Sequence, residues 1–413
     1  MLSKAILKLR GHKMKQVFKE TIKYMWRSEK NRLFMVITTA LVLLYTLVVV
    51  PNLSSENEVN MANLERDMTG NVVQFEDALD QGLIVPSALT GTTAYNNLRR
   101  EYVAQREVLT ALRQGDVRRY ISTSYRPGDG RDDTEGIEQI ASSIFGYELE
   151  QPFQSQKNAV YVDEIENLSF HTVHDRTSLQ QMHLFLVGFG PILLLLGLLF
   201  LISDVHVKDR SLETQKVGHP LNWQAYTWTQ AVVALGFVTV FYLFLAGLFF
   251  FLNGLFYGFG SFELPIGYYN AGFERGVLNL ANFQIQTIGW FLIRALPFLV
   301  MLGYLFTRLN TLFSLWTKQS IVTMALGMFL VLFQFIYYGT DATELLGINI
   351  THFPQTYFDF GKFITGRFEL QTGGVEIPGF ISHGLFVLGL TILVVELVIY
   401  LSSKKITRQK FVG

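Results

Sequence analysis

Cysteine is absent from this sequence of 413 residues, and charged residues make up only 16% of it. The missing thiols exclude disulfide bonds and thiolate metal sites. Three motifs are also missing: the His-Glu-x-x-His zinc motif, the Gly-x-Ser-x-Gly nucleophile elbow and the P-loop that binds nucleotide phosphates. We therefore predict that this chain is not an enzyme, holds no metal or cofactor, and cannot bind ATP by itself.

Half of the residues are hydrophobic, and nearly half of these lie in six runs with few or no charges. Each run is close to the roughly 20 residues that a helix needs to cross the hydrocarbon core of a bilayer. We predict an all-α membrane protein with six transmembrane helices at residues 33–50, 183–203, 224–252, 286–307, 319–338 and 381–402. The segments between and around them are 1–32, 51–182, 204–223, 253–285, 308–318, 339–380 and 403–413.

The distribution of basic residues predicts the orientation, because cytoplasmic segments retain Lys and Arg during insertion. The segment before the first span carries ten Lys or Arg and two Glu, and the last segment carries Lys404, Lys405, Arg408 and Lys410. Both termini are therefore predicted to be cytoplasmic. The inner segments then hold 19 basic and 5 acidic residues, and the outer segments hold 14 basic and 28 acidic residues. Nucleic acid is not an expected partner.

The first span is predicted to be a retained anchor, because the sequence after it, Val49-Val50-Pro51-Asn52-Leu53, lacks a signal-peptide cleavage pattern. Just before this span, residues 14–28 place apolar side chains near one side of a helix and basic side chains largely elsewhere. This pattern suits a helix in the inner membrane interface. The alternative is a basic cytoplasmic tail that only fixes the topology.

The outer segment 51–182 is long enough to have its own core. Its first half repeats apolar residues every three or four positions on either side of Gly82 to Gly91, which predicts a mainly helical domain with a helical hairpin. No fold is assigned to residues 123–180. His171, His174 and Asp175 form only a weak metal pattern that is more typical of an ordinary surface. The loops 253–285 and 339–380 are rich in Gly and aromatic residues, which suits segments at the membrane interface.

Two places in the sequence are candidates for function. The inner loop 204–223 begins with mixed charges, continues as a short helix and breaks at Gly218 and Pro220. The spans themselves contain two charges, Arg294 and Glu396, and such residues are costly in a membrane. Their depths differ by roughly 10 Å in straight helices, which disfavours a direct bridge. Each residue either snorkels or pairs locally to hold the bundle together, or lines a transport pathway. We expect Arg294 to face the protein interior or a dimer interface.

The order of these elements resembles the permease subunits of ABC-2-type ATP-binding-cassette exporters. Those proteins have an interfacial helix before the first span, six spans, and a coupling loop between the second and third spans that passes through Glu, Gly and Pro. The counterparts here are residues 14–28 and a loop whose coupling residues would be Lys208, Asp209, Arg210, Glu213, Lys216, Gly218 and Pro220. The large outer segment resembles the bacterial branch that exports peptides, antibiotics or lipids.

This resemblance implies a subunit in the plasma membrane of a bacterium, surrounded by membrane lipid. It also implies a separate ABC ATPase subunit that carries ATP and Mg²⁺, and a second permease chain that is identical or related. The substrate would be hydrophobic or amphipathic. Three alternatives remain open: a four-span mechanotransmitting permease, a membrane sensor that uses residues 51–182, and a polytopic enzyme with unfamiliar motifs.

Overall fold

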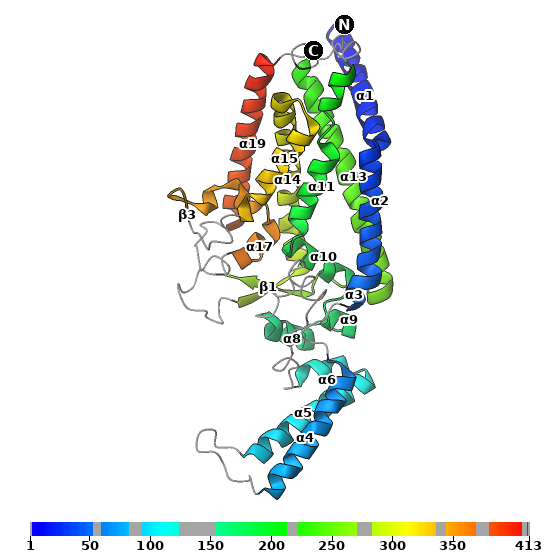
Figure 1. Cartoon of the computed structure of the whole chain (residues 1–413), viewed down its shortest axis with the longest axis vertical. Helices are drawn as coiled ribbons and strands as arrows, with labels where there is room; N and C mark the ends of the chain where they lie inside the picture. Colours follow the sequence, from blue (N-terminus) through cyan, green and yellow to red (C-terminus); the bar gives the residue numbers. More distant parts are fainter. Residues whose placement is uncertain are drawn as a thin grey trace.

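The computed structural model describes residues 2–52, 59–81, 93–123, 153–212, 222–270, 283–335, 344–368, 380–406 and 411. Most of these residues are helical, in agreement with the predicted fold class. Two antiparallel ribbons of two strands each are additional features that the sequence did not predict. Figure 1 shows a bundle of long helices with a helical arm that projects from one end.

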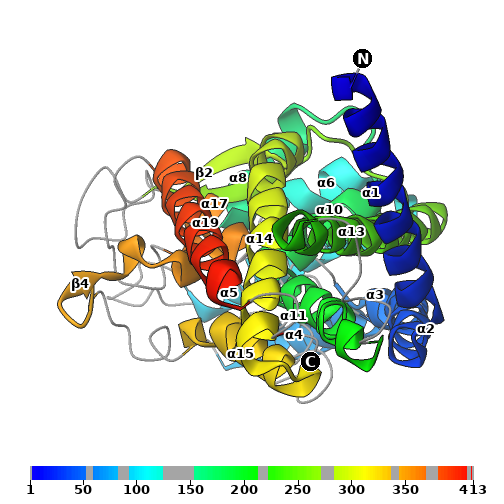
Figure 2. The same ribbon diagram turned by 90° about the horizontal axis from the view of Figure 1, so that it is seen from above.

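The N-terminal helices run along one side of the bundle. They are α1 (Leu2–Arg27), α2 (Glu29–Leu44), the π-helical turn η1 (Tyr45–Val49) and α3 (Val50–Asn52). The rest of the bundle consists of α10 (Ser178–Val187), α11 (Gly190–Ile202), α13 (Trp223–Tyr257), α14 (Ile288–Thr317), α15 (Ser320–Leu332) and α19 (Phe380–Lys405). Seen from above, α14 lies centrally, with α13 and α19 on either side of it (Figure 2).

Five helical stretches within the described residues are long and apolar enough to cross a membrane: Glu29–Asn52, Gly190–Arg210, Trp223–Tyr257, Ile288–Thr317 and Ile381–Lys405. They correspond to five of the six predicted spans. Four of them are longer than predicted, most of all α13 with 35 residues and α14 with 30. At about 1.5 Å per residue, both exceed the roughly 30 Å thickness of the hydrocarbon core.

A full span at 319–338 is not confirmed. The helix there, α15, has only 13 residues, or about 20 Å, and residues 336–338 lie outside the described part. Figure 1 shows that the start of α1 and the end of α19 nevertheless lie at the same end of the bundle. The chain therefore returns across the bundle between α14 and α19, and the described part of this return contains no sixth helix as long as the other five.

The predicted span 183–203 is also not continuous. It is divided between α10 and α11, and the break falls at Gly188, whose ψ of −139° is not helical. Pro191 in the first turn of α11 lacks the N–H that a continuing helix would require from it. The length that crosses the bundle is therefore α11 together with the turn that follows it.

The arm consists of α4 (Met61–Asp80), α5 (Ala94–Gln114) and α6 (Val117–Ser122). The predicted helical hairpin is confirmed, because α4 and α5 pack against each other along their length. Its core includes the predicted apolar positions Leu64 and Leu109, and the Phe75 ring packs edge-on against Tyr102. The segment 82–92 that joins the two helices lies outside the described residues.

Short elements fill the space between the arm and the bundle. They are α8 (Gln154–Asp163), α9 (Phe170–Val173), and the paired strands β1 (Pro265–Tyr269) and β2 (Phe283–Thr287). A second group comprises β3 (Glu344–Leu345), β4 (Ile348–Asn349), two 3-10 turns (Ile350–His352 and Pro354–Tyr357) and α17 (Phe360–Ile364).

The second group packs into the bundle through its aromatic residues. The rings of Phe358 and Phe306 lie 4.9 Å apart, and those of Phe360 and Phe298 lie 6.1 Å apart, so this segment contacts the middle of α14. All four residues belong to the main hydrophobic core. The aromatic composition of 339–380, which predicted a segment at the interface, thus reflects packing between helices in the described part of this loop.

The close contact of α17 with α10 predicts that one added methyl group strongly lowers the stability of the chain. A Cβ atom at Gly361 would collide with the backbone carbonyl oxygen of Leu186, so α17 can lie against α10 only with glycine there. We expect Gly361→Ala to lower the free energy of unfolding by about 1–3 kcal/mol, measured by thermal unfolding of the purified chain. Gly70→Ala is the control, because Gly70 has open space around its Cβ position and alanine favours a helix. Equal stability of the two variants would contradict the observed packing.

Candidate functional site

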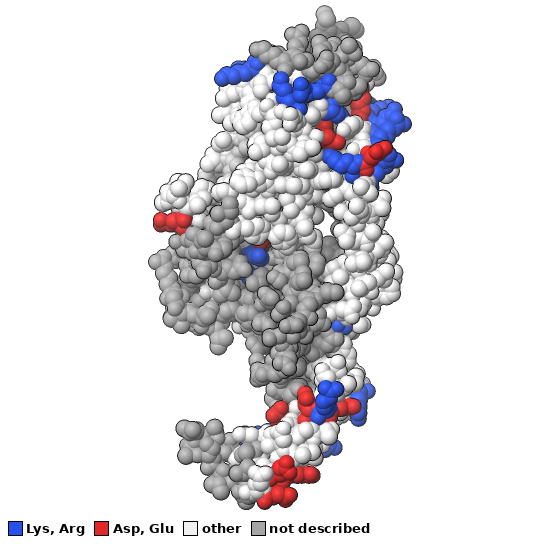
Figure 3. Space-filling view, in the orientation of Figure 1, with Lys and Arg blue, Asp and Glu red and all other residues white. Residues whose placement is uncertain are grey.

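The charged side chains gather at the two ends of the molecule. Figure 3 shows Lys and Arg at the end that carries α1, a largely uncharged middle, and charges of both signs on the arm. The end with α1 is the one that the sequence predicts to be cytoplasmic. We first describe the polar side chains that are buried near this end.

The turn after α11 is anchored to the start of α13 by a buried carboxylate. It continues into a 3-10 helix, Val207–Leu212. Within it, Asp209 is 1% exposed and accepts hydrogen bonds from the Tyr226 hydroxyl (2.8 Å) and the Gln230 amide (2.9 Å). These bonds fix the Gln230 amide nitrogen toward Asp209, so its oxygen faces His206 Nδ1 at 3.1 Å. His206 Nδ1 must therefore donate that hydrogen bond.

The same network reaches α14. His206 Nε2 lies 2.9 Å from the Thr311 hydroxyl, and Asn310 donates to the Ile202 carbonyl at the end of α11. Both α14 residues are buried. Buried hydrogen bonds between separate elements hold those elements in one arrangement. The turn after α11 is thus attached to two other long helices.

A second set of contacts attaches this turn to the N-terminal helices. The Tyr24 hydroxyl donates to Asp204 (2.9 Å), and Lys30 forms an ion pair with the same carboxylate (3.1 Å). The ammonium group of Lys208 lies 4.0 Å from the centre of the Tyr24 ring. Burial of Tyr24, together with the charge of Asp204, raises the pKa of its hydroxyl, so the tyrosine remains a donor at physiological pH.

The predicted coupling residues fall into three groups. Asp209 does not lie on the surface, and the expectation that it faces a partner is corrected by its burial and its bonds to α13. Lys208 and Arg210 are half-buried, and Arg210 donates to the Lys318 carbonyl at the end of α14 (3.1 Å). The other four residues lie outside the described part of the chain: Glu213, Lys216, Gly218 and Pro220.

Glu396 has its partner on α14. Arg308 donates from Nε to Oε1 and from Nη2 to Oε2 (2.9 Å), and the Tyr304 hydroxyl also donates to Oε1 (2.7 Å). Arg308 and Glu396 each lie nine residues from the inner ends of their helices, Thr317 and Lys405, so they share one level. Arg308 lies one residue beyond the predicted span 286–307, so the sequence did not indicate it as a charge within the membrane. The available signal was the spacing of Tyr304 and Arg308. They lie four residues apart with no helix breaker between them, and therefore on one face of the helix.

Arg294 lies apart from this pair. It is half-buried, its guanidinium lies 4.1 Å from the centre of the Trp290 ring, and its neighbours Ile293 and Leu296 are exposed. The expected separation of Arg294 from Glu396 agrees with the structure, since Glu396 pairs 14 residues further along α14. Whether a second chain covers Arg294 stays a prediction.

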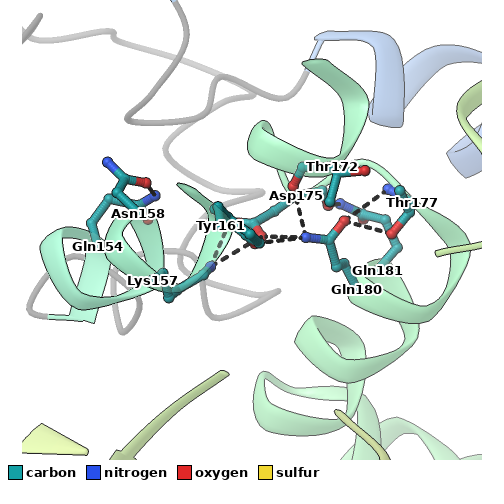
Figure 4. A network of polar contacts seen from close by, with 9 residues as sticks. All are labelled: Gln154, Lys157, Asn158, Tyr161, Thr172, Asp175, Thr177, Gln180 and Gln181. Atoms are coloured by element: carbon teal, nitrogen blue, oxygen red, sulfur yellow. Dashed lines mark hydrogen bonds and ion pairs between the residues drawn. The ribbon is translucent and has the colours of Figure 1, made fainter. Parts of the chain in front are cut away.

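A third polar network lies at the opposite end of the bundle (Figure 4). Lys157 in α8 and Asp175 form an ion pair with both Nζ–O distances near 3 Å, and both side chains are at least nine-tenths buried. Gln180 at the start of α10 donates to Asp175 (2.9 Å) and to the Thr172 carbonyl (2.8 Å). The segment of the chain next to the arm is thereby attached to α10.

This network also reaches the first span. Gln181 donates to the Asp175 carbonyl (2.7 Å) and accepts from the Tyr45 hydroxyl (2.7 Å). Tyr45 begins the π-helical turn of the Glu29–Asn52 stretch. Two neighbouring glutamines of α10 therefore bond in different directions, one toward α8 and the other toward the first span.

The weak metal pattern at His171, His174 and Asp175 is used for packing and ion pairing. The His171 ring lies against Tyr257 (5.3 Å between centroids), and the His174 ring lies against Tyr120 (6.2 Å). Burial and the nearby Arg176 lower the pKa of His171. In the part of the chain that the structure describes, no group of three His, Asp or Glu side chains is placed to hold a metal ion.

No protein-family model, curated protein or solved structure matches this chain. Its class therefore rests on its own features. The chain is a mainly helical protein with several helices long and apolar enough to cross a membrane, which defines a multi-pass membrane protein.

The pairing of Arg308 with Glu396 predicts the stability of single and double variants. Arg308→Met leaves a carboxylate between apolar helices without its counter-charge, which typically costs about 3–5 kcal/mol of unfolding free energy. Arg308→Met combined with Glu396→Met should restore most of this loss, because two apolar side chains replace the pair. Arg294→Met in the same helix loses a cation–π contact and a long hydrogen bond to the Trp290 carbonyl, and should cost about 1 kcal/mol. Thermal unfolding in detergent measures all three, and a double variant as unstable as Arg308→Met would contradict the pairing.

Proposed function

We propose that this chain is the permease subunit of an ABC exporter of the ABC-2 type. It moves a hydrophobic or amphipathic substrate, such as a peptide, antibiotic or lipid, with energy from ATP that a separate subunit hydrolyses. The observation that carries the proposal is the attachment of the turn 203–212 to three other elements: α1 through Tyr24, α13 through Asp209, and α14 through His206. A partner that displaces this turn would displace all three.

The chemistry of these contacts suits the transmission of force. Buried hydrogen bonds and ion pairs resist separation, because each separated group would lose its partner without gaining water. A movement of the turn is therefore passed on to the helices as a rigid-body shift rather than absorbed locally. In this proposal ATP and Mg²⁺ bind only to the ATPase subunit, and the missing P-loop of this chain agrees with that division of roles.

The proposed pore contains a second permease chain, identical or related. Large apolar side chains are exposed on α2, α13, α14, α15 and α19, so the bundle offers apolar surface both to lipid and to another chain. The polar network around Asp175 attaches the segment next to the arm to α10 and to the first span. Movements of the bundle would thus reach the outer part of the molecule.

The same observations distinguish the exporter from two alternative functions. A four-span permease is disfavoured by five stretches long and apolar enough to cross a membrane. A membrane sensor is favoured by one feature, the buried Lys157–Asp175 pair, which would pass a ligand-induced movement of the arm to α10. The inner attachments of the turn 203–212 favour the exporter, because a sensor has no evident use for them.

The test is purification of the chain from its native membrane, followed by identification of what accompanies it. We expect an ABC ATPase subunit to copurify, no ATP hydrolysis by the chain alone, and stimulation of the ATPase by the chain. Lys208→Glu should reduce this stimulation by about tenfold, which corresponds to about 1.4 kcal/mol of coupling free energy. Reversing the charge of Asp209 is an unsuitable test. The new positive charge would be buried without a partner of opposite charge and would unfold the turn.

The matched control is Arg99→Glu, which reverses an exposed charge on α5 of the arm and should leave the stimulation unchanged. Three results would refute the proposal: strong ATPase activity of the purified chain alone, the absence of any ATPase subunit, or equal stimulation by the Lys208 and Arg99 variants and the native chain.

A further inference from the structure

Residues 14–28 of α1 present three different faces. The first face packs on the bundle: Val17, Thr21 and Met25 are each at most 1% exposed. Val17 contacts Tyr226 near the start of α13, and the ring of Trp26 lies 6.4 Å from that of Phe237 further along the same helix. This face is accounted for by the fold, and the other two are not.

The second face is cationic. It carries one basic side chain per turn, each four residues after the last and each exposed: Lys15, Lys19, Lys23 and Arg27. Among the described residues, none of the four lies in an ion pair. Their spacing brings four positive charges to one side of the helix, where they repel one another unless an anion lies nearby. Figure 3 shows that this end of the molecule is rich in Lys and Arg, with a few Asp or Glu among them. Glu20 is the one acidic residue of the segment 14–28, so the four basic side chains outnumber it.

The third face is apolar and equally uncovered. Phe18 and Trp26 are 49% and 62% exposed. Beyond the bend at Ser28, the apolar surface continues on α2 with Leu33 and Val36, which are 62% and 67% exposed. Apolar surface that lies on both sides of this bend, next to the span, meets the same surroundings as the span, namely the bilayer.

We infer that this part of α1 binds anionic phospholipid headgroups at the inner membrane surface. The apolar face enters the leaflet beside the first span, and the four cations, spaced along the helix, face the lipid headgroups. An acidic protein would neutralise the same cations but would leave Phe18 and Trp26 in water. Amphipathic helices with Lys and Arg on one side and Trp and Phe on the other bind anionic membranes in this way.

Bound lipid would therefore hold α1 in its position on the bundle. Tyr24 and Lys30 attach the end of α1 and the start of α2 to Asp204, so bound lipid would also hold the turn after α11. The inference needs only the membrane and does not depend on an ATPase partner.

The absence of cysteine allows a clean test with the full chain. Ile22 lies between Phe18 and Trp26 along the helix, so Ile22→Cys accepts an environment-sensitive fluorophore on the apolar side. The labelled chain is reconstituted in vesicles of phosphatidylcholine alone and in vesicles with added phosphatidylglycerol. We expect stronger quenching by spin-labelled lipid in the second case, and weaker quenching at high salt.

A triple variant tests the cations directly. Each Lys near an anionic surface favours binding by about fivefold, so Lys15→Gln, Lys19→Gln and Lys23→Gln together should weaken the response to phosphatidylglycerol by about a hundredfold. The control triple variant, Lys318→Gln, Lys404→Gln and Lys405→Gln, removes the same charge at the same end outside α1 and should keep the response.

Three outcomes would overturn the inference: equal quenching in both vesicles, a response that persists in the α1 triple variant, or a fluorophore shielded in native membranes by a protein that can be washed away. The last outcome would identify a protein partner for this face. None of these measurements involves ATP, so their failure would leave the proposed exporter function untouched.

Discussion

Polar side chains among apolar helices have no water to bond with, so each of them must find its partner within the protein. This constraint decides where the long helices of the chain lie relative to one another. The Arg308–Glu396 pair fixes the level of α14 against α19. His206 and Asp209 fix the turn after α11 against α13 and α14. Hydrophobic packing holds the helices together, but it allows many alignments, and the polar pairs select one of them.

The two ends of the bundle use this constraint differently. At the end predicted to be cytoplasmic, the polar network is built on one short turn and joins α1, α13 and α14 to it. At the other end, the network is built on the first turns of α10 and joins the outer segment to the first span through Asp175 and Gln181. In the proposed exporter, the first network receives a displacement from the ATPase partner and the second carries it to the outer part of the molecule.

The sequence predicted the features that depend on composition and local period. Long uncharged runs predicted five helices, and the repeat of apolar residues in 61–79 and 98–120 predicted the hairpin of the arm. Prediction from the sequence failed where contacts with residues distant in the sequence determine the local structure. The run 319–338 looked like a span, but its helix α15 ends at Leu332 within the described residues, and a full span there is not confirmed. Asp209 looked like a surface charge, because its partners Tyr226 and Gln230 belong to the next helix. The break at Gly188 was missed, because hydrophobicity alone does not register a change in backbone direction.

The central claim is that the chain crosses a membrane with the polar turn 203–212 inside and the arm outside. Labelling of single cysteines with a membrane-impermeant maleimide in intact cells tests it most directly, since the native chain has none. Glu101→Cys on exposed α5 should react in intact cells, whereas Lys404→Cys at the end of α19 should react only after permeabilisation. Reaction of both positions from the same side of the membrane would contradict this account.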